Sequence, residues 1–216
     1  LVLPESLVTV DLYAFYGCSG LKSLVFSSEI KNWSSRTFEA CSNLESVELL
    51  ASIKTIPSGT FENCRSLKNV SLGNALERIG SDAFKDCRSL VEIQIPESVS
   101  NIYDGAFDGC SSLTKINLPS SLKAINSETF KGCSVLPEIK IPESVTAIGS
   151  AAFSCCFAMT EISLPDSVAS IGASAFSGCK NLSTVNFPEG LTQISVSAFA
   201  NCKLSGELTL PDSIEY

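Results

Sequence analysis

Residues 113–135, LTKINLPSSLKAINSETFKGCSV, contain one complete copy of the pattern that decides the fold. Phe130 and Cys133 in this stretch belong to two series that recur every 23 residues without an insertion or deletion. The phenylalanines stand at positions 15, 38, 61, 84, 107, 130, 153, 176 and 199, and the cysteines at 18, 41, 64, 87, 110, 133, 156, 179 and 202. Such a fixed period is typical of a solenoid, because each short unit buries its apolar face by stacking on a near-copy of itself. We therefore expect residues 1–216 to form one elongated array of about nine repeats.

The beginning of the unit predicts a short β-strand. Leu113, Ile116 and Leu118 are apolar, whereas Lys115 and Asn117 alternate with them and should face solvent. Proline follows this segment in most units, and since it has no N–H group to donate, it marks the end of strand pairing. Strands of about four or five residues would then stack into a parallel sheet on the concave face of the solenoid.

The second half of the unit predicts turns, a short second strand and a single helical or 3-10 turn on the convex side. Leu122 and Ile125 supply apolar positions, and the segment that ends before Cys133 has the pattern of one helical turn. The residue before each ladder cysteine is Gly, Asn or Asp in seven of nine units, and these types tolerate left-handed backbone. We expect a positive φ along this column, with Ala40 and Cys155 carrying local strain of about 1 kcal/mol each.

The cysteine series predicts a column of free, buried thiols. Stacking in register places neighbouring cysteine Cα atoms about 4.8 Å apart, within reach of a disulfide, but their Cβ atoms point in parallel instead of toward each other. Each thiol should act as a small hydrophobe that donates its S–H to a carbonyl of a neighbouring loop. A linear column also cannot surround a zinc ion tetrahedrally, and we expect no metal and no cofactor.

The composition excludes several classes of function. The chain has 15 basic and 23 acidic residues, so it lacks the excess of positive charge that neutralises nucleic-acid phosphates. It contains no histidine, which excludes every catalytic mechanism that depends on this residue. No run of about 18 apolar residues occurs, so this segment should not insert directly into a membrane. We expect a protein that is not an enzyme and that binds no nucleic acid.

The solvent-facing strand positions are the candidate binding surface. They carry lysines and glutamates in near balance and lack aromatic and arginine side chains, the types that anchor tight interfaces. We expect weak, repeated contacts with a protein or glycan ligand, and the alternative is an ordinary solvated face. The candidate residues on this concave face are Lys68, Asn69, Glu92, Gln94, Lys115, Asn117, Glu138, Lys140 and Glu161.

One short segment departs from the repeat. Cys155 lies outside the cysteine series, next to Cys156, and Phe157 occupies a position that is polar in most other units. A functional interpretation is a small apolar contact patch or an accessible thiol. The alternatives are neutral variation and a contact with a neighbouring module.

An acidic column follows the ends of the strands. Its members stand at positions 5, 97, 143, 166, 189 and 212. Turn chemistry, in which a carboxylate accepts a hydrogen bond from a nearby backbone N–H, accounts for this column better than weak calcium binding. Neighbouring units supply only one carboxylate each, whereas calcium requires several oxygen ligands.

The complete unit, Leu-x-x-Ile-x-Leu-Pro-x-Ser-Val-x-x-Ile-Gly-x-x-Ala-Phe-x-Gly-Cys, resembles the BspA-like, or TpLRR-class, leucine-rich repeats. The match is clearest between residues 89 and 191 and extends over essentially all of the chain. The resemblance implies a leucine-rich-repeat solenoid of the α/β class. It also implies a non-enzymatic adhesion or protein-binding scaffold of a cell-surface or secreted protein, with a host or matrix protein as a ligand. A structural spacer that holds other modules apart is the alternative.

The chain begins and ends within a repeat and starts without a signal peptide. We therefore expect it to be a segment of a longer protein, with the targeting signals outside it. Unpaired apolar faces at the two ends of such an array would also favour end-to-end self-association.

Overall fold

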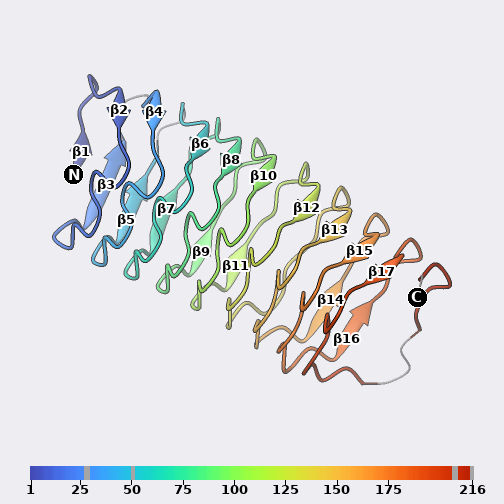
Figure 1. The fold of residues 1–216 in the computed structure, drawn as a ribbon. Coiled ribbons are helices and arrows are strands. Elements are labelled where there is room, and N and C mark those ends of the chain that lie inside the picture. The colour runs from blue at the N-terminus through green and yellow to red at the C-terminus, as the bar shows by residue number, and fades with distance from the viewer. Residues whose placement is uncertain (27–29, 50–51, 206–208, 215–216) are drawn as a thin grey trace.

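The computed structural model describes residues 1–26, 30–49, 52–205 and 209–214. It shows a solenoid of short strands, with successive coils stacked from the N-terminus to the C-terminus (Figure 1). Every strand pair is parallel and joins residues 23 positions apart, as Val2 pairs with Val25 and Ile162 with Val185. The expected solenoid is confirmed. None of the described segments forms a helix of the length and apolarity that crossing a bilayer requires.

The first series of strands and the residues next to it carry the candidate binding residues. It pairs in three groups, β1–β3–β5–β7, β9–β11 and β14–β16. The strands have two to four residues, fewer than the roughly four or five that the proline positions predict. The bounds are β1 (Val2–Leu3), β3 (Ser23–Phe26), β5 (Ser46–Glu48), β7 (Asn69–Ser71), β9 (Glu92–Ile93), β11 (Lys115–Ile116), β14 (Glu161–Ser163) and β16 (Thr184–Asn186).

A second series of two-residue strands follows the turn after each first-series strand, as expected. It pairs as β2–β4, β6–β8–β10 and β12–β13–β15–β17. In most of these strands the second residue is buried and the first faces outward, which is the alternation of a strand with one core face. The bounds are β2 (Thr9–Val10), β4 (Asn32–Trp33), β6 (Thr55–Ile56), β8 (Arg78–Ile79), β10 (Asn101–Ile102), β12 (Ala124–Ile125), β13 (Ala147–Ile148), β15 (Ser170–Ile171) and β17 (Gln193–Ile194).

The segment between each second strand and its ladder cysteine is a run of turns. The N–H groups of Asp82, Phe84 and Asp86 donate to carbonyl oxygens of the next coil, at 2.9, 2.8 and 2.7 Å. The N–H groups between them donate to the carbonyl three residues earlier in the same coil. This arrangement replaces the single helical turn expected from the sequence. In a helix every N–H points back along its own chain, whereas here alternate N–H groups join neighbouring coils.

Two residues in each coil have left-handed backbone. The predicted column before the ladder cysteine is confirmed in all nine coils, with φ between 56° and 76°, and it includes Ala40 and Cys155. A second column, which the residue types do not predict, lies two residues before each phenylalanine and has φ between 52° and 65°. Its members are Tyr13, Arg36, Gly59, Asp82, Gly105, Glu128, Ala151, Ser174 and Ser197. The two columns reverse the local path of the backbone, which lets alternate peptide groups reach the next coil.

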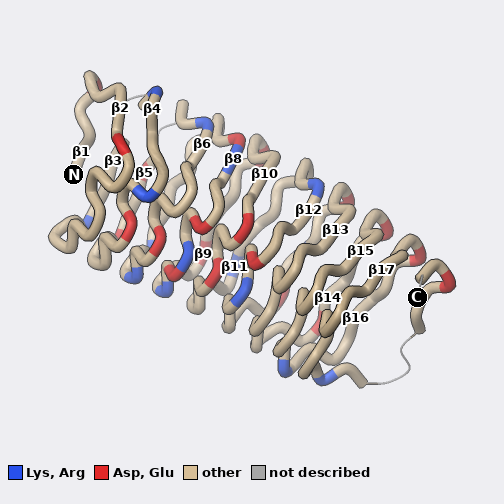
Figure 2. The backbone as a smooth tube through the Cα atoms, viewed as in Figure 1, with Lys and Arg blue, Asp and Glu red and all other residues tan. Residues whose placement is uncertain are grey.

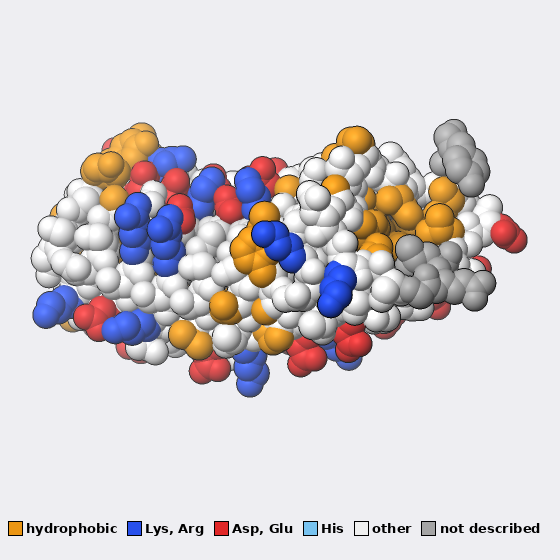
Figure 3. All heavy atoms as spheres, turned by 90° about the horizontal axis from the view of Figure 1, so that it is seen from below, with side chains coloured by type: hydrophobic (Ala, Val, Ile, Leu, Met, Phe, Trp, Pro, Cys, Tyr) orange, Lys and Arg blue, Asp and Glu red, His pale blue; other side chains and the backbone are white. Residues whose placement is uncertain are grey.

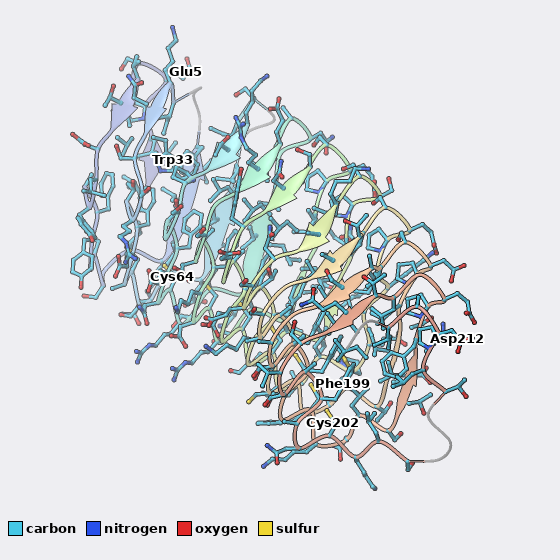
Figure 4. The ribbon with its side chains drawn as sticks, turned by 45° about the vertical axis from the view of Figure 1, so that its right-hand side comes forward. Glu5, Trp33, Cys64, Phe199, Cys202 and Asp212 are labelled. Atoms are coloured by element: carbon cyan, nitrogen blue, oxygen red, sulfur yellow. The ribbon has the colours of Figure 1, made fainter. Side chains whose placement is uncertain are left out.

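The phenylalanine series forms one continuous stack inside the solenoid. The ring centroids of neighbouring coils lie 5.0 to 6.0 Å apart, and the rings are within 20° of parallel. The seven rings from Phe38 to Phe176 are fully buried, whereas Phe15 and Phe199 at the ends are partly buried. Figure 4 shows Phe199 and Cys202 in the last part of the stack, with Glu5 and Asp212 at outer bends. The aromatic column therefore forms a continuous central part of the hydrophobic core.

The cysteine series forms the predicted column of free thiols beside the rings. In each of eight coils the Sγ atom lies 3.0 to 3.3 Å from the carbonyl oxygen of the phenylalanine one coil earlier, in position to donate its S–H. Burial raises the pKa of Cys41 to about 11 and that of Cys179 to about 12. It raises the pKa of the five ladder thiols between them well above the ordinary value of 9.0. These thiols stay protonated and packed at neutral pH.

Candidate functional site

The first-sheet face consists of the outward-facing side chains of the first series of strands, of the residues that flank these strands, and of residues 137–141. Eight of the nine candidate binding residues are exposed on it, and Asn117 is half-buried. Behind them Ile93, Ile139 and Ile162 are buried, so the predicted inward and outward positions are confirmed except at Asn117. The role of the nine residues in binding remains a prediction.

Two hollows divide this face. The first has a volume of about 360 Å³ and is lined in part by Lys68, Asn69, Glu92 and Gln94. The second has a volume of about 580 Å³. It is lined by Thr114, Lys115, Ile116, Glu138, Ile139, Lys140, Ile141, Glu143, Glu161, Ile162, Ser163 and Pro165. The face expected to be concave therefore gathers eight of the nine candidate residues into two depressions.

Each hollow lies where the strand ladder is interrupted. No pairing joins β7 to β9, and residues 137–141 form no strand between β11 and β14. In several other coils an N–H at the position of Pro137 donates to the preceding coil, as Thr114 does to Val91 and Ser183 to Thr160. Pro137 has no N–H group, so this bond to Thr114 cannot form. The second hollow therefore opens at a break in the sheet to which Pro137 contributes.

Five of the six charged candidate residues form no ion pair or side-chain hydrogen bond with the described part of the chain. They are Glu92, Lys115, Glu138, Lys140 and Glu161. Lys68 differs from them, because its Nζ lies 3.4 Å from the Oε2 of Glu45. The central charges thus keep their full capacity for an external partner.

Asn117 is committed to the fold. Its amide nitrogen donates to the carbonyl oxygen of Ile95, and its amide oxygen accepts from the N–H of Ile95, both at 2.8 Å. The side chain thereby replaces the next main-chain pair after β11, which helps explain why this strand is short. The expectation that Asn117 is fully solvent-facing is wrong, because strand alternation does not reveal that an amide can bond to the backbone of a neighbouring coil.

Replacing Asn117 by Ala should lower the free energy of unfolding by about 1–2 kcal/mol, because the N–H and C=O of Ile95 lose their partner. Urea denaturation measures this change. Asn186 is the matched control, since it occupies the same position of the repeat, is exposed and has no side-chain hydrogen bond to a described residue. Asn186→Ala should change stability by less than about 0.5 kcal/mol, and equal losses in the two variants would contradict the assigned role of Asn117.

The predicted atypical segment combines a half-buried thiol with an exposed aromatic ring. The Sγ of Cys155 lies 3.7 Å from the hydroxyl of Ser154. Phe157 is 40% exposed, and the Nζ of Lys180 lies 5.3 Å from the centroid of its ring. A cation at this position interacts favourably with the face of the ring. A role for Cys155 and Phe157 in binding remains a prediction.

The acidic column lies at successive bends, and Figure 2 shows acidic residues at several consecutive bends toward the C-terminal end of the array. Glu97 supports the interpretation as turn chemistry. Its Oε2 accepts from the N–H and the hydroxyl of Ser120 in the next coil, both at 2.9 Å. These two bonds hold the pKa of the Glu97 carboxyl below its ordinary value. No group of three or more acidic or cysteine side chains in the described residues is placed to hold a metal ion.

Charges on the turn segments are largely paired with each other. The guanidinium of Arg36 lies 2.8 Å from both Glu39 and Glu62, and Lys85 contacts Asp82 and Asp108 at 3.3 and 3.5 Å. Figure 3 shows acidic and basic side chains mixed along this edge in the N-terminal half of the molecule. These pairs satisfy one another, so this edge is a weaker candidate for ligand binding than the first-sheet face.

A family model described as "BspA type Leucine rich repeat region" matches residues 1–114 and 100–216, with six copies of the repeat. The chain belongs to the BspA-type leucine-rich repeat family. This family consists of repeat scaffolds. A search of curated proteins returned no match to this BspA-type chain.

Solved structures of bacterial leucine-rich repeat proteins resemble this BspA-type chain. A leucine-rich repeat protein from Bacteroides ovatus ATCC 8483 is 25% identical with a TM-score of 0.68, and the alignment covers 100% of this chain and 76% of that one. The leucine-rich repeat protein of T. pallidum, TpLRR, is 29% identical with a TM-score of 0.68, and 84% of this chain and 77% of that one are covered. The predicted family and fold class are confirmed.

Proposed function

We propose that this BspA-type array is a non-enzymatic protein-binding scaffold and that its first-sheet face is the binding surface. The chain carries no histidine, and its repeated positions are occupied by packing residues, so the variable outward positions are what remains for function. The family resemblance further supports a place in a cell-surface or secreted protein with an adhesive role.

The observation that carries the proposal is the set of uncommitted charges around the second hollow. Lys115 and Lys140 line a depression of about 580 Å³ together with Glu138 and Glu161, and none of them is neutralised by a described residue. Exposed charges of both signs in a depression favour a partner with complementary charges. The family supplies repeat scaffolds for this kind of contact.

A binding titration tests the proposal. The chain is measured by biolayer interferometry against a panel of purified matrix proteins and polysaccharides, and we expect at least one partner with a Kd in about the micromolar range. The variant Lys115→Glu/Lys140→Glu should weaken binding by about tenfold or more. The control is Lys123→Glu/Lys203→Glu, which makes the same change in net charge at exposed lysines outside the first-sheet face. Absence of binding, or equal losses in both variants, would count against the proposal.

A structural spacer is the second candidate, favoured by the unbroken register of the strands along the chain. Deleting residues 93–138 removes two coils of 23 residues and joins equivalent positions of the repeat. A spacer would keep its fold and lose about 10 Å of length, whereas the binding scaffold would lose affinity because Lys115 and Glu138 are removed. Small-angle X-ray scattering and the same titration distinguish the two results.

A further inference from the structure

Exposed apolar residues, called here the apolar rim, lie in or next to the coils that line the second hollow. Val91, Val135 and Phe157 are 49%, 41% and 40% exposed, and Pro137 is exposed as well. The N–H of Ala158 donates to the carbonyl of Ser134, so the loop that carries Phe157 lies directly beside the loop that carries Val135. Adjacent exposed apolar side chains on a soluble protein mark an interaction surface.

The rim is local to the middle of the array. At the position of Phe157 the coils on either side have Ser134 and Lys180, and at the position of Val135 the preceding coil has Ser112. Figure 3 shows hydrophobic side chains next to a row of acidic and basic ones along its lower edge. The apolar substitutions therefore occur in the same coils as the uncommitted charges, although the two features belong to different columns of the repeat.

Charges of both signs lie side by side in this region. Along one column Glu92, Lys115, Glu138 and Glu161 follow one another in successive coils, and Lys140 stands two residues after Glu138. A polyanionic chain would meet the lysines but would be repelled by the glutamates between them. A neutral sugar would displace water from these charged side chains but would supply no opposite charge to offset the cost of removing that water. A polypeptide that carries both acidic and basic side chains matches the pattern.

The break in the sheet adds main-chain groups to the same region. Residues 138–141 line the hollow. Their main-chain groups form no hydrogen bond with the described residues of the coils on either side. Main-chain N–H and C=O groups in this position can bond to water or to the backbone of a bound peptide. A peptide backbone offers donors and acceptors at regular spacing, as these groups require.

We propose that the docking locus of the scaffold is confined to residues 91–163 and that it takes an extended protein segment with acidic and basic side chains and one aliphatic or aromatic side chain for the rim. This inference rests on the function proposed above and narrows it to one part of the face and one class of partner. The part of the first-sheet face that precedes residue 91 takes no part in this contact, because Lys68 is already paired with Glu45.

A random dodecapeptide library displayed on phage and selected against the full chain tests this inference. Enriched peptides are synthesised, and their affinities are measured by fluorescence anisotropy. We expect sequences that contain both Lys or Arg and Asp or Glu, together with an aliphatic or aromatic residue. The variant Glu138→Lys/Lys140→Glu should weaken their binding by about tenfold, and Phe157→Ser should weaken it by about threefold or more.

The matched control is Glu45→Lys/Lys68→Glu. Both double variants exchange one acid and one base on exposed positions of the same face, so net charge is unchanged. The control also retains an ion pair, and it should change affinity by less than about twofold. Thermal midpoints within about 2 °C of the parent chain establish that all variants are folded.

Three different results would each contradict a different part of the proposal. Equal losses in the two exchange variants would refute the assignment to residues 91–163 while leaving the scaffold function in place. A library without binders, beside a chain that still binds a polysaccharide of the earlier panel, would refute the peptide partner. Failure to bind either a peptide or any member of that panel would refute the proposed function itself.

Discussion

Raising the pH from about 8 to about 10 should reduce the free energy of unfolding by roughly 10 kcal/mol, because each buried thiol contributes about 1.4 kcal/mol to this loss. Seven ladder thiols, from Cys41 to Cys179, are fully buried. Burial raises the pKa of each above the ordinary value of 9.0. The folded chain therefore retains seven protons in a pH range where the unfolded chain releases them. The stabilisation is complete below about pH 9 and is lost as the pH rises.

Urea denaturation at a series of pH values, in the presence of a phosphine reductant, measures this dependence. Since most domains have a stability of about 5–15 kcal/mol, the loss is large enough to unfold the chain in mild alkali. The variant Cys110→Ala/Cys133→Ala isolates the contribution of the thiols. Above about pH 9 its stability should fall less steeply, by about 2.7 kcal/mol per pH unit. A stability that stays constant to pH 10, or identical slopes in both chains, would show that the thiols ionise freely in the fold.

Truncating the central ring of the aromatic stack should have the largest effect of any single substitution. Phe107 is fully buried, and its centroid lies 5.5 Å from that of Phe84 and 5.7 Å from that of Phe130. Replacement by Ala removes the contacts on both ring faces and leaves a cavity that rigid neighbouring coils cannot close. We expect a loss of about 3–5 kcal/mol in the free energy of unfolding, measured by urea denaturation.

Phe157→Ala provides the control for Phe107→Ala. It makes the same chemical change at a ring that is 40% exposed and lies outside the stack. This variant should change stability by no more than about 0.5 kcal/mol. Phe199→Ala should fall between the two, because that ring is partly buried and has Phe176 stacked on one face, with Phe187 packed edge-to-face against it. Comparable losses at Phe107 and Phe157 would mean that stability does not reside in the aromatic column.

The parts of the fold that could be predicted from the sequence are those in which side-chain chemistry repeats with the period. Phenylalanine and cysteine recur every 23 residues because both must pack, and the Gly, Asn and Asp column before the cysteine indicates left-handed backbone. The second left-handed column could not be predicted. It holds residues as different as Tyr13, Arg36 and Ala151, because its conformation is imposed by hydrogen bonds between coils and not by the preference of each residue.

Only part of the candidate site could be predicted from the sequence. Alternation along a strand places Lys115 and Glu138 outward, since it requires nothing beyond the period of two. The two hydrogen bonds between the Asn117 side chain and Ile95 depend on the path of the neighbouring backbone. The alternation of residues along one strand gives no information about that path. Pro137 did carry a signal, because a proline within a strand segment removes a donor from the ladder. The rim of Val91, Val135 and Phe157 emerges only when residues from different coils are brought side by side.

The constant register of the coils has a consequence for how such a molecule can evolve. Because equivalent residues are always 23 positions apart, duplicating or losing the coding segment for one coil joins ring to ring and thiol to thiol at the new junction. Recombination between repeats can then lengthen or shorten the rod in a single event without creating a packing defect. Each event also changes the distance between the hollow at Pro137 and the ends of the rod. Evolution can therefore move this site along the rod without changing the residues that form it.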